Sequence, residues 1–311
     1  MTAAATVPSP VATAPAPGCA TVARTLGESP EGTATPMRSW LLIEHPEAWA
    51  RDVADTVLAR AFPPESRREL AELRRRHGLR PLLIRRVGYR AGTPRRRAVL
   101  VGGVHPGHRW LERLEVGDLR ELADLDLAAV ADGRGGLGEP VTGPLFGVCT
   151  HGAKDMCCAT LGRPVARALA EAAPGRVWET THLGGDRFAG NVLVLPAGFL
   201  YGHVTATSAT RLAAAAAEDR VLPELLRGRT SVGMRAQVAE IAVRRITGLH
   251  GVEEVEPLSE DADGLVVVRA GDRRMGVRLD RQSLGVCGTS RCAGPASPCG
   301  YTVSELVELP V

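Results

Sequence analysis

The residue types with the clearest chemical potential lie in the middle of the chain. Cys149, Cys157 and Cys158 fall within ten residues of one another, and His182 and Asp186 follow further along the chain. Thiolates, imidazoles and carboxylates are the protein ligands of iron and zinc. Because the two groups flank segments that read as neighbouring strands, we expect them to meet in space, and the spacing predicts a metal site.

The elements between these residues must position them. LFGVC, residues 145–149, is a short apolar run typical of a buried strand, and a helix is predicted to start at Gly162-Arg163-Pro164, since proline suits a first helical turn. RVWETT, NVLVLPAG and FLYGHV read as strands, and the last two are joined by a turn at Pro196–Gly198. The predicted order is strand, ligand loop, helix, strand, ligand loop and hairpin.

Several segments carry a resemblance to a known family. CTHGAKDMCCATLGRP, VWETTHLGGDRFAGNVLVLP and LYGHV resemble the signature of the sucrase/ferredoxin-like family, and CATVARTLGESPEGTA, SWLLIEHPEAW, LLIRRVG and LRGRTSVGMRAQVAEIAVR support it. Together these segments cover most of the chain from Cys19 to about residue 245. The resemblance implies a thioredoxin-like ferredoxin core that binds one 2Fe-2S cluster.

The resemblance also implies a ligand set of two cysteines and two histidines. By position these are Cys149, Cys158 and His182, and the second histidine falls on residue 186, where this chain has an aspartate. We therefore predict Cys149, Cys158, His182 and Asp186 as the metal ligands, with Cys157 as the alternative fourth ligand. The sequence does not favour a Rieske site, because Cys158 is followed three residues later by Leu161 and not by a histidine.

Four further residues are predicted to contact the cofactor. Gly184 and Gly185 let the backbone approach closely and donate hydrogen bonds. His151 is placed to hydrogen-bond the cluster or to carry protons. Arg187 is read as a salt-bridged loop residue or, alternatively, as part of a charged collar that would steer a redox partner.

The function predicted from these features is that of a non-catalytic electron carrier that works with a redox partner protein. Two alternatives remain open, a thiol-redox enzyme on the same fold and a structural zinc domain, because Cys, His and carboxylate ligands also suit zinc. The thiol-redox alternative has only the vicinal pair Cys157-Cys158 and lacks a CxxC motif in the core. Sucrose hydrolysis is rejected, because nothing marks a sugar site with paired carboxyl groups.

The chain of 311 residues divides into four predicted regions: a disordered tail at 1–18, an α/β portion at 19–140, a thioredoxin-like ferredoxin domain at 141–248 and a small antiparallel β appendage at 249–311. In the α/β portion, helices at 50–61 and 66–78 alternate with strands, which predicts a mostly parallel sheet. The same alternation recurs in the ferredoxin domain, so two related halves are compatible with the pattern, although no sequence identity between them indicates a repeat.

Composition restricts the class of protein. The net charge of +3 is too small to imply a nucleic-acid partner, and no segment approaches the ~20 apolar residues that span a bilayer. Seven cysteines, an odd number, do not form a secreted disulfide framework, so we expect a cytoplasmic protein. The last three, Cys287, Cys292 and Cys299, lack a CxxC pair and are read as incidental thiols.

Overall fold

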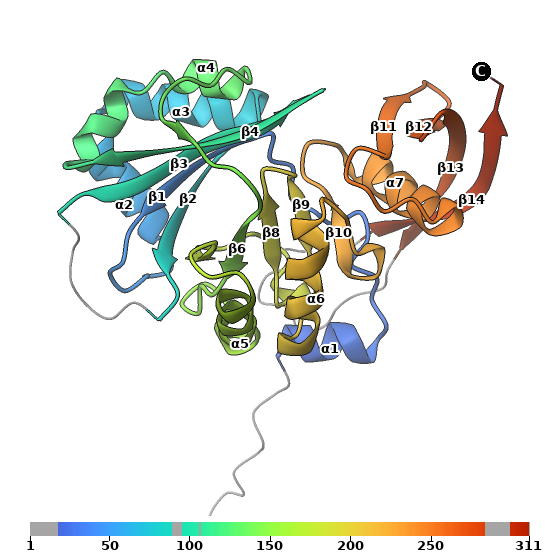
Figure 1. Ribbon diagram of the computed structural model, residues 1–311, viewed down its shortest axis with the longest axis horizontal. Coiled ribbons are helices and arrows are strands. Elements are labelled where there is room, and N and C mark those ends of the chain that lie inside the picture. Colours follow the sequence, from blue (N-terminus) through green and yellow to red (C-terminus); the bar gives the residue numbers. More distant parts are fainter. Residues whose placement is uncertain (1–17, 89–94, 106, 284–298, 311) are drawn as a thin grey trace, which may run out of the picture.

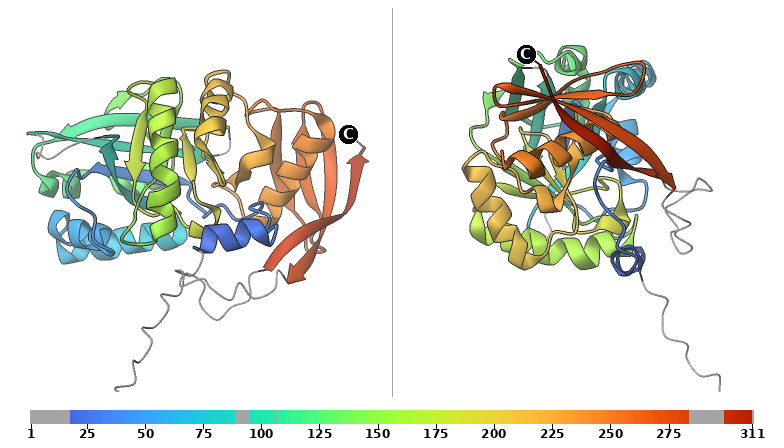
Figure 2. Two further views of the ribbon diagram at one scale, coloured as in Figure 1. Left: turned by 90° about the horizontal axis from the view of Figure 1, so that it is seen from below. Right: turned by 90° about the vertical axis from the view of Figure 1, so that its right-hand side faces the viewer.

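The computed structural model describes residues 18–88, 95–105, 107–283 and 299–310 (Figure 1). The predicted tail at 1–18, except Gly18, and the predictions for Cys287 and Cys292 therefore lie outside the described residues. A ten-stranded sheet forms the body of the molecule, and its strand order is β10-β9-β8-β6-β7-β2-β1-β3-β4-β5. A separate four-stranded antiparallel sheet lies at one end (Figures 1 and 2). The predicted mixed α/β architecture with a small antiparallel appendage is confirmed.

The N-terminal half of the large sheet contains four main strands with helices between and after them. Its elements in chain order are α1 (Cys19–Thr25), β1 (Ser39–Glu44), α2 (Val53–Ala61), α3 (Pro64–Arg76), β2 (Leu79–Arg86), β3 (Arg97–His105), β4 (His108–Val116), η1 (Leu119–Asp124), α4 (Leu127–Ala131) and β5 (Glu139–Pro140). The two predicted helices correspond to α2 and α3. Strand β4 was missed, because the alternation in HRWLERLEV is interrupted by charge.

The C-terminal half carries the predicted ligand residues. Its elements are β6 (Leu145–Cys149), α5 (Met156–Ala172), β7 (Val177–Thr180), η2 (Asp186–Phe188), β8 (Val192–Leu195), β9 (Phe199–Tyr201), α6 (Ala206–Ala217), η3 (Pro223–Leu225) and β10 (Leu226–Arg229). The hairpin through Pro196–Gly198 is confirmed by the antiparallel pairing of β8 with β9. Helix α5 begins six residues earlier than predicted: the Asp155 carboxylate caps it by accepting from the Cys157 N–H, so Pro164 lies inside the helix.

The two halves share one strand topology. The N-terminal half has the order β2-β1-β3-β4 and the C-terminal half the order β7-β6-β8-β9, and in each half the first pair is parallel and the next two pairs are antiparallel. Antiparallel pairing of β2 with β7 joins them into one sheet. The expected mostly parallel sheet is therefore wrong. Tight hairpins connect β3 to β4 and β8 to β9, and a hairpin can pair only antiparallel strands.

Each half has its own core on one face of the sheet. Leu41, Ile43 and Val99 pack with α2 and α3, while Phe146 and Val148 pack with α5 and α6. The other face curls inward and encloses a third core that both halves share. Its members are Ala34, Met37, Trp40, Leu42, Leu82, Ile84, Ala98, Leu100, Val104, Leu111, Leu145, Cys149, Cys158, Trp178, Leu183, Leu193, Leu195 and Leu200. Two predicted ligands thus belong to the core that holds the halves together.

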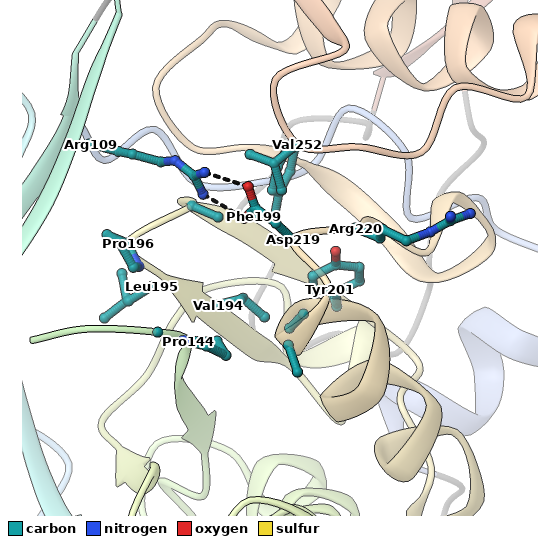
Figure 3. A pocket seen from close by; sticks show the side chains of 14 residues that line it. Arg109, Pro144, Val194, Leu195, Pro196, Phe199, Tyr201, Asp219, Arg220 and Val252 are labelled. Carbon is teal, nitrogen blue, oxygen red and sulfur yellow. Dashed lines mark hydrogen bonds and ion pairs between the residues drawn. The ribbon is translucent and has the colours of Figure 1, made fainter.

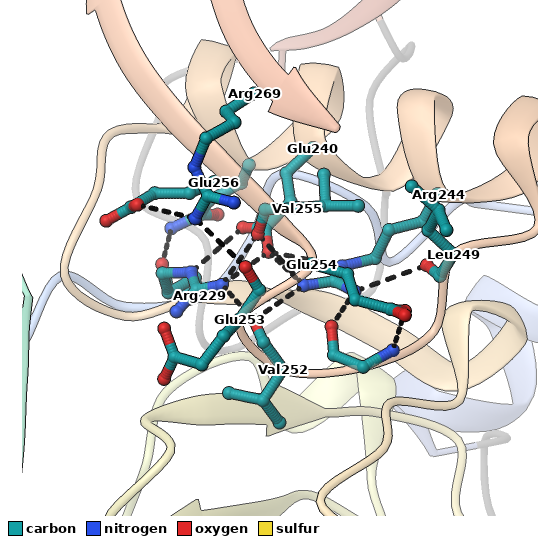
Figure 4. Close-up of polar contacts among 12 residues, drawn as sticks. Arg229, Glu240, Arg244, Leu249, Val252, Glu253, Glu254, Val255, Glu256 and Arg269 are labelled. Atoms are coloured by element: carbon teal, nitrogen blue, oxygen red, sulfur yellow. Dashed lines mark hydrogen bonds and ion pairs between the residues drawn. The ribbon is translucent and has the colours of Figure 1, made fainter. Parts of the chain in front are cut away.

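The C-terminal sheet consists of β11 (Val255–Glu260), β12 (Val266–Ala270), β13 (Arg273–Ser283) and β14 (Cys299–Leu309). Helix α7 (Met234–Thr247) packs on all four strands and also on β10, so it links this sheet to the large one. The link is polar as well as apolar. The fully buried Glu240 of α7 lies 2.9 Å from Arg229 Nη2 and 2.9 Å from Arg244 Nη2, and both arginines also donate to the Val252 and Val255 carbonyls (Figure 4).

Candidate metal centre

Cys149 and Cys158 are brought together by the close packing of α5 against the end of β6. Cys149 is the last residue of β6, where its N–H donates to the Asn191 carbonyl at 3.0 Å. Cys158 lies in the first turn of α5, and both thiols are buried, with 1% and 0% of their surface exposed. Gly162 allows this approach, because a Cβ there would overlap the Cys149 carbonyl oxygen.

His182 reaches the same point from the loop after β7. Its Nδ1 lies 3.7 Å from the Cys158 Sγ, and the ligand atoms of Cys149, Cys158 and His182 all lie within 4.8 Å of one another. The imidazole is half-buried, whereas both sulfur atoms belong to buried residues. The structure therefore brings three of the four predicted ligands to one point at the edge of the shared inner core.

A buried arginine holds the loop that follows His182. Gly184 and Gly185 have φ of 86° and 68°, a region that favours glycine, and a Cβ on Gly185 would overlap the Arg227 guanidinium. Arg227 Nη1 donates to the Gly184 carbonyl and to Asn191 Oδ1, each at 2.8 Å, and Asn191 Nδ2 donates to the Gly185 carbonyl at 2.8 Å. Arg227 and Asn191 were not predicted. Neither is a cysteine or a histidine, and the pattern of those two residue types was the basis for predicting the site.

A hydrogen bond between the two thiols shifts their pKa values in opposite directions. The hydrogen bond from Cys158 is the main cause that holds the pKa of Cys149 well below its ordinary value. Desolvation opposes this shift, and His182 and the His151 backbone N–H lower the pKa further. The pKa of Cys158 is raised by that same hydrogen bond, by burial and by the Cys149 charge. The pair therefore favours one thiolate, on Cys149, and the thiolate is the form of cysteine that binds metals.

Asp186 does not belong to the group of three. It opens the η2 turn, it is 4% exposed, and its Oδ2 is buried without a hydrogen-bond partner among the described residues. Its charge contributes to the raised pKa of Cys158, so the carboxylate lies near that thiol. The positive φ values of Gly184 and Gly185 turn the chain between His182 and Asp186, which removes the simple i, i+4 relation of a helix.

The other predicted cofactor residues have different surroundings. His151 is 3% exposed, its Nε2 lies 2.8 Å from the Ala50 carbonyl, and its Nδ1 is buried with no partner among the described residues. Arg187 instead pairs with Glu28, with 2.6 Å from Nε to Oε1, and its Cζ lies 4.5 Å from the Phe188 ring centroid. That ion pair attaches η2 to the segment after α1.

Cys157, the alternative fourth ligand, belongs to a second cluster. Its Sγ lies 3.6 Å from the Cys19 Sγ, and the ligand atoms of Cys19, Asp155 and Cys157 also lie within 4.8 Å of one another. Sequence spacing gives no sign of this group, because 138 positions separate the two cysteines. The only available signal was that Cys19 opens one of the segments resembling the family.

A cavity of about 360 Å³ lies elsewhere, against β8, β9 and α6 (Figure 3). Its lining is mostly apolar and includes Val194, Phe199 and Tyr201, and at its side Arg109 forms an ion pair with Asp219. None of the predicted ligand residues lines it. This cavity therefore adds no residue to the group of Cys149, Cys158 and His182.

Comparison with known proteins agrees with the central segments. A family model described as sucrase/ferredoxin-like matches residues 30–228, which is more than half of the chain. The chain therefore belongs to the sucrase/ferredoxin-like family. No curated protein and no solved structure matches it. Among the described residues, no helix combines the length and apolar character needed to cross a bilayer.

Proposed function

We propose that this member of the sucrase/ferredoxin-like family binds one 2Fe-2S cluster through Cys149, Cys158 and His182 and works as an electron carrier. The observation that carries the proposal is the convergence within 4.8 Å of two buried thiols, at the end of β6 and the start of α5, and one imidazole in the loop after the adjacent strand β7. When bound, such a cluster accepts and releases one electron at a time.

The strand order of the C-terminal half supports this proposal. A parallel β6-β7 pair, followed by antiparallel β8 and β9 and flanked by α5 and α6, is the arrangement expected of a thioredoxin-like core. In this arrangement Cys149 at the end of β6 and Cys158 at the start of α5 would hold one iron. His182 would contribute to the second iron, and its half-buried imidazole would provide the route to a redox partner.

Asp186 is the fourth ligand that we propose. A buried carboxylate oxygen without a hydrogen bond costs free energy unless something absent from the apoprotein satisfies it, and Oδ2 of Asp186 is such an atom. Cys157 is the weaker candidate, because its sulfur lies beside Cys19. His151 would keep its N–H directed at the Cys149 sulfur, which stabilises the thiolate.

A second candidate function is a structural site for one zinc ion. The compactness of the three-ligand group favours it, because ligand atoms within 4.8 Å of one another can surround a single tetrahedral ion. The two candidates differ in colour, in redox activity and in metal content.

The test is anaerobic purification followed by metal analysis and spectroscopy. We expect a brown protein with about two irons and two acid-labile sulfides per chain and an EPR signal on reduction. A colourless wild-type protein that contains zinc, together with loss of that zinc in Cys149→Ser, would support the second candidate and overturn the first. Cys292→Ser is the control, since its position lies outside the predicted ligand segments.

A further inference from the structure

The second cysteine cluster is built from two distant parts of the chain. Cys19 is the first residue of α1, and Asp155 and Cys157 are the N-cap and the second residue of α5. Helix α1 also packs on η2, so the start of the described chain lies directly against the ligand loops. The contact at Cys157 is tight, because a Cβ on Gly18 would come within 2.8 Å of its Sγ.

The distances in this cluster are those of a tetrahedral site. With Zn–S near 2.3 Å and Zn–O near 2.1 Å, a tetrahedral ion separates two sulfurs by about 3.8 Å and a sulfur from an oxygen by about 3.6 Å. The two sulfurs lie 3.6 Å apart, and the Cys19 Sγ lies 3.9 Å and 4.0 Å from the two Asp155 oxygens. Two thiols and a carboxylate are therefore already at nearly the spacing that one ion requires.

We propose that Cys19, Cys157 and Asp155 bind one zinc ion at a site separate from the centre of Cys149, Cys158 and His182. Binding releases the two thiol protons to solvent and forms two Zn–S bonds and one Zn–O bond. Asp155 and Cys157 are only half-buried, so a water molecule can occupy the fourth position. The donor set of two thiolates and an oxygen suits zinc better than calcium or magnesium, which prefer oxygen ligands.

This site would fasten α1 to the start of α5. Cys157 and Cys158 are consecutive in one helical turn but face different clusters, one half-buried and one buried. The proposal does not depend on which metal the first centre binds.

The experiment measures zinc and iron per chain in protein purified anaerobically from cells supplied with both metals. We expect Cys19→Ser and Cys157→Ser each to remove about one zinc ion per chain and to leave iron, sulfide and the visible spectrum unchanged. Cys149→Ser is the reciprocal variant: it should remove the metal of the first centre and leave this zinc in place. If the first centre fails to bind iron, the zinc difference between wild type and Cys19→Ser still tests the second site.

The variant Asp155→Asn separates the loss of a metal ligand from a loss of folded structure. The amide oxygen can still accept the Cys157 N–H and cap α5, but the charge on the metal ligand is lost. We expect the dissociation constant for zinc, measured against a chromogenic chelator, to rise about tenfold or more while the helical circular dichroism is unchanged. Equal zinc content in wild type and Cys19→Ser would overturn the proposal. So would a disulfide between Cys19 and Cys157 in the anaerobically purified chain.

Discussion

The two halves of the large sheet have one topology but different chemistry at equivalent positions. In the C-terminal half, the last register pair of the parallel strands is Cys149 with Thr180; in the N-terminal half it is Glu44 with Ile84. Glu44 is satisfied within the fold, because it accepts the Ala98 N–H at 2.9 Å, whereas Cys149 belongs to a cluster of side chains that could hold a metal ion. The same strand ends therefore serve packing in one half and chemistry in the other.

This difference shows that the strand arrangement does not itself create the site. The end of β6, the start of α5 and the loop after β7 supply the two cysteines, His182 and the Gly184-Gly185 turn, whereas the loops after β1 and β2 contain no cysteine and no Gly-Gly pair. A fold can host a function on one copy of a motif and use the other copy as a scaffold. The N-terminal half here contributes its share of the inner core against which Cys149 and Cys158 pack.

The largest expected effect is the loss of the metal centre from one half only. Cys149→Ser or Cys158→Ser should abolish cluster assembly, because a hydroxyl replaces the thiolate that anchors iron. The matched change in the other half, Glu44→Gln, keeps an oxygen for the Ala98 N–H and should leave the iron content unchanged. Iron and sulfide analysis measures both. A full cluster in Cys149→Ser would remove the proposed asymmetry between the halves.

The next effect concerns the fourth ligand. If Asp186 binds iron, Asp186→Ala should destabilise the cluster or shift its spectrum, and Asp186→His should give a firmer cluster, because imidazole is a softer ligand than carboxylate. The rate of cluster loss on exposure to a chelator measures this. Cys157→Ser is the control and should keep the cluster. A stable cluster in Asp186→Ala, together with its loss in Cys157→Ser, would exclude Asp186 and contradict the zinc site as well.

A smaller effect is expected where the halves are joined. Arg85 of β2 and Glu179 of β7 are register partners, with 2.8 Å from Nε to Oε2, and Glu179 also accepts from Thr150 Oγ1 at 2.9 Å. Arg85→Gln leaves a buried carboxylate without its counter-ion. Breaking a fully buried pair costs ~3–5 kcal/mol, and this pair is partly exposed, so we expect about 2 kcal/mol from urea unfolding.

The double variant separates the charge from the contact. Adding Glu179→Gln to Arg85→Gln removes the stranded charge and should restore part of the lost stability. An equal loss in the single and the double variant would show that the loss comes from the missing Arg85 contacts and not from the unpaired charge of Glu179.

Much of this fold follows from local patterns, but strand direction does not. Local patterns indicated the strands β6, β7, β8 and β9 and the helices α2 and α3, and the Pro196–Gly198 turn indicated a hairpin. The alternation of helices with strands suggested a parallel sheet, but it does not show which strand pairs with which. Direction is decided by the short β3–β4 connection and by the pairing of β2 with β7, which joins residues far apart in sequence.

The site was predictable to a similar degree. Residue type and resemblance led to Cys149, Cys158 and His182, which the fold brings together. Cys19 could not be paired with Cys157 from spacing, since their contact depends on how α1 packs against η2 and α5. Arg227 could not be predicted either, because the hydrogen bond from its guanidinium to the Gly184 carbonyl forms only in the folded loop.

The last effect, which is absent at neutral pH, compares a histidine in each half. Burial, with the nearby charges of Arg24 and Arg227, lowers the pKa of His203 to about 4, and burial also lowers the pKa of His45, where the Glu47 carboxylate opposes it. A histidine with a depressed folded pKa binds its proton more readily in the unfolded chain, so stability falls as pH falls from about 6.5 towards 4. The unfolding free energy should therefore decrease over this window.

His203→Asn should flatten that pH dependence more than His45→Asn does, because no carboxylate offsets burial among the causes of the His203 shift. Asparagine suits the position, since His203 has a φ of 54° and asparagine tolerates the left-handed region. The measurement is the urea midpoint of each variant at several pH values between 4 and 7. Equal slopes in wild type and His203→Asn would show that this histidine titrates normally in the fold, and a larger change in His45→Asn would reverse the expected order of the two halves.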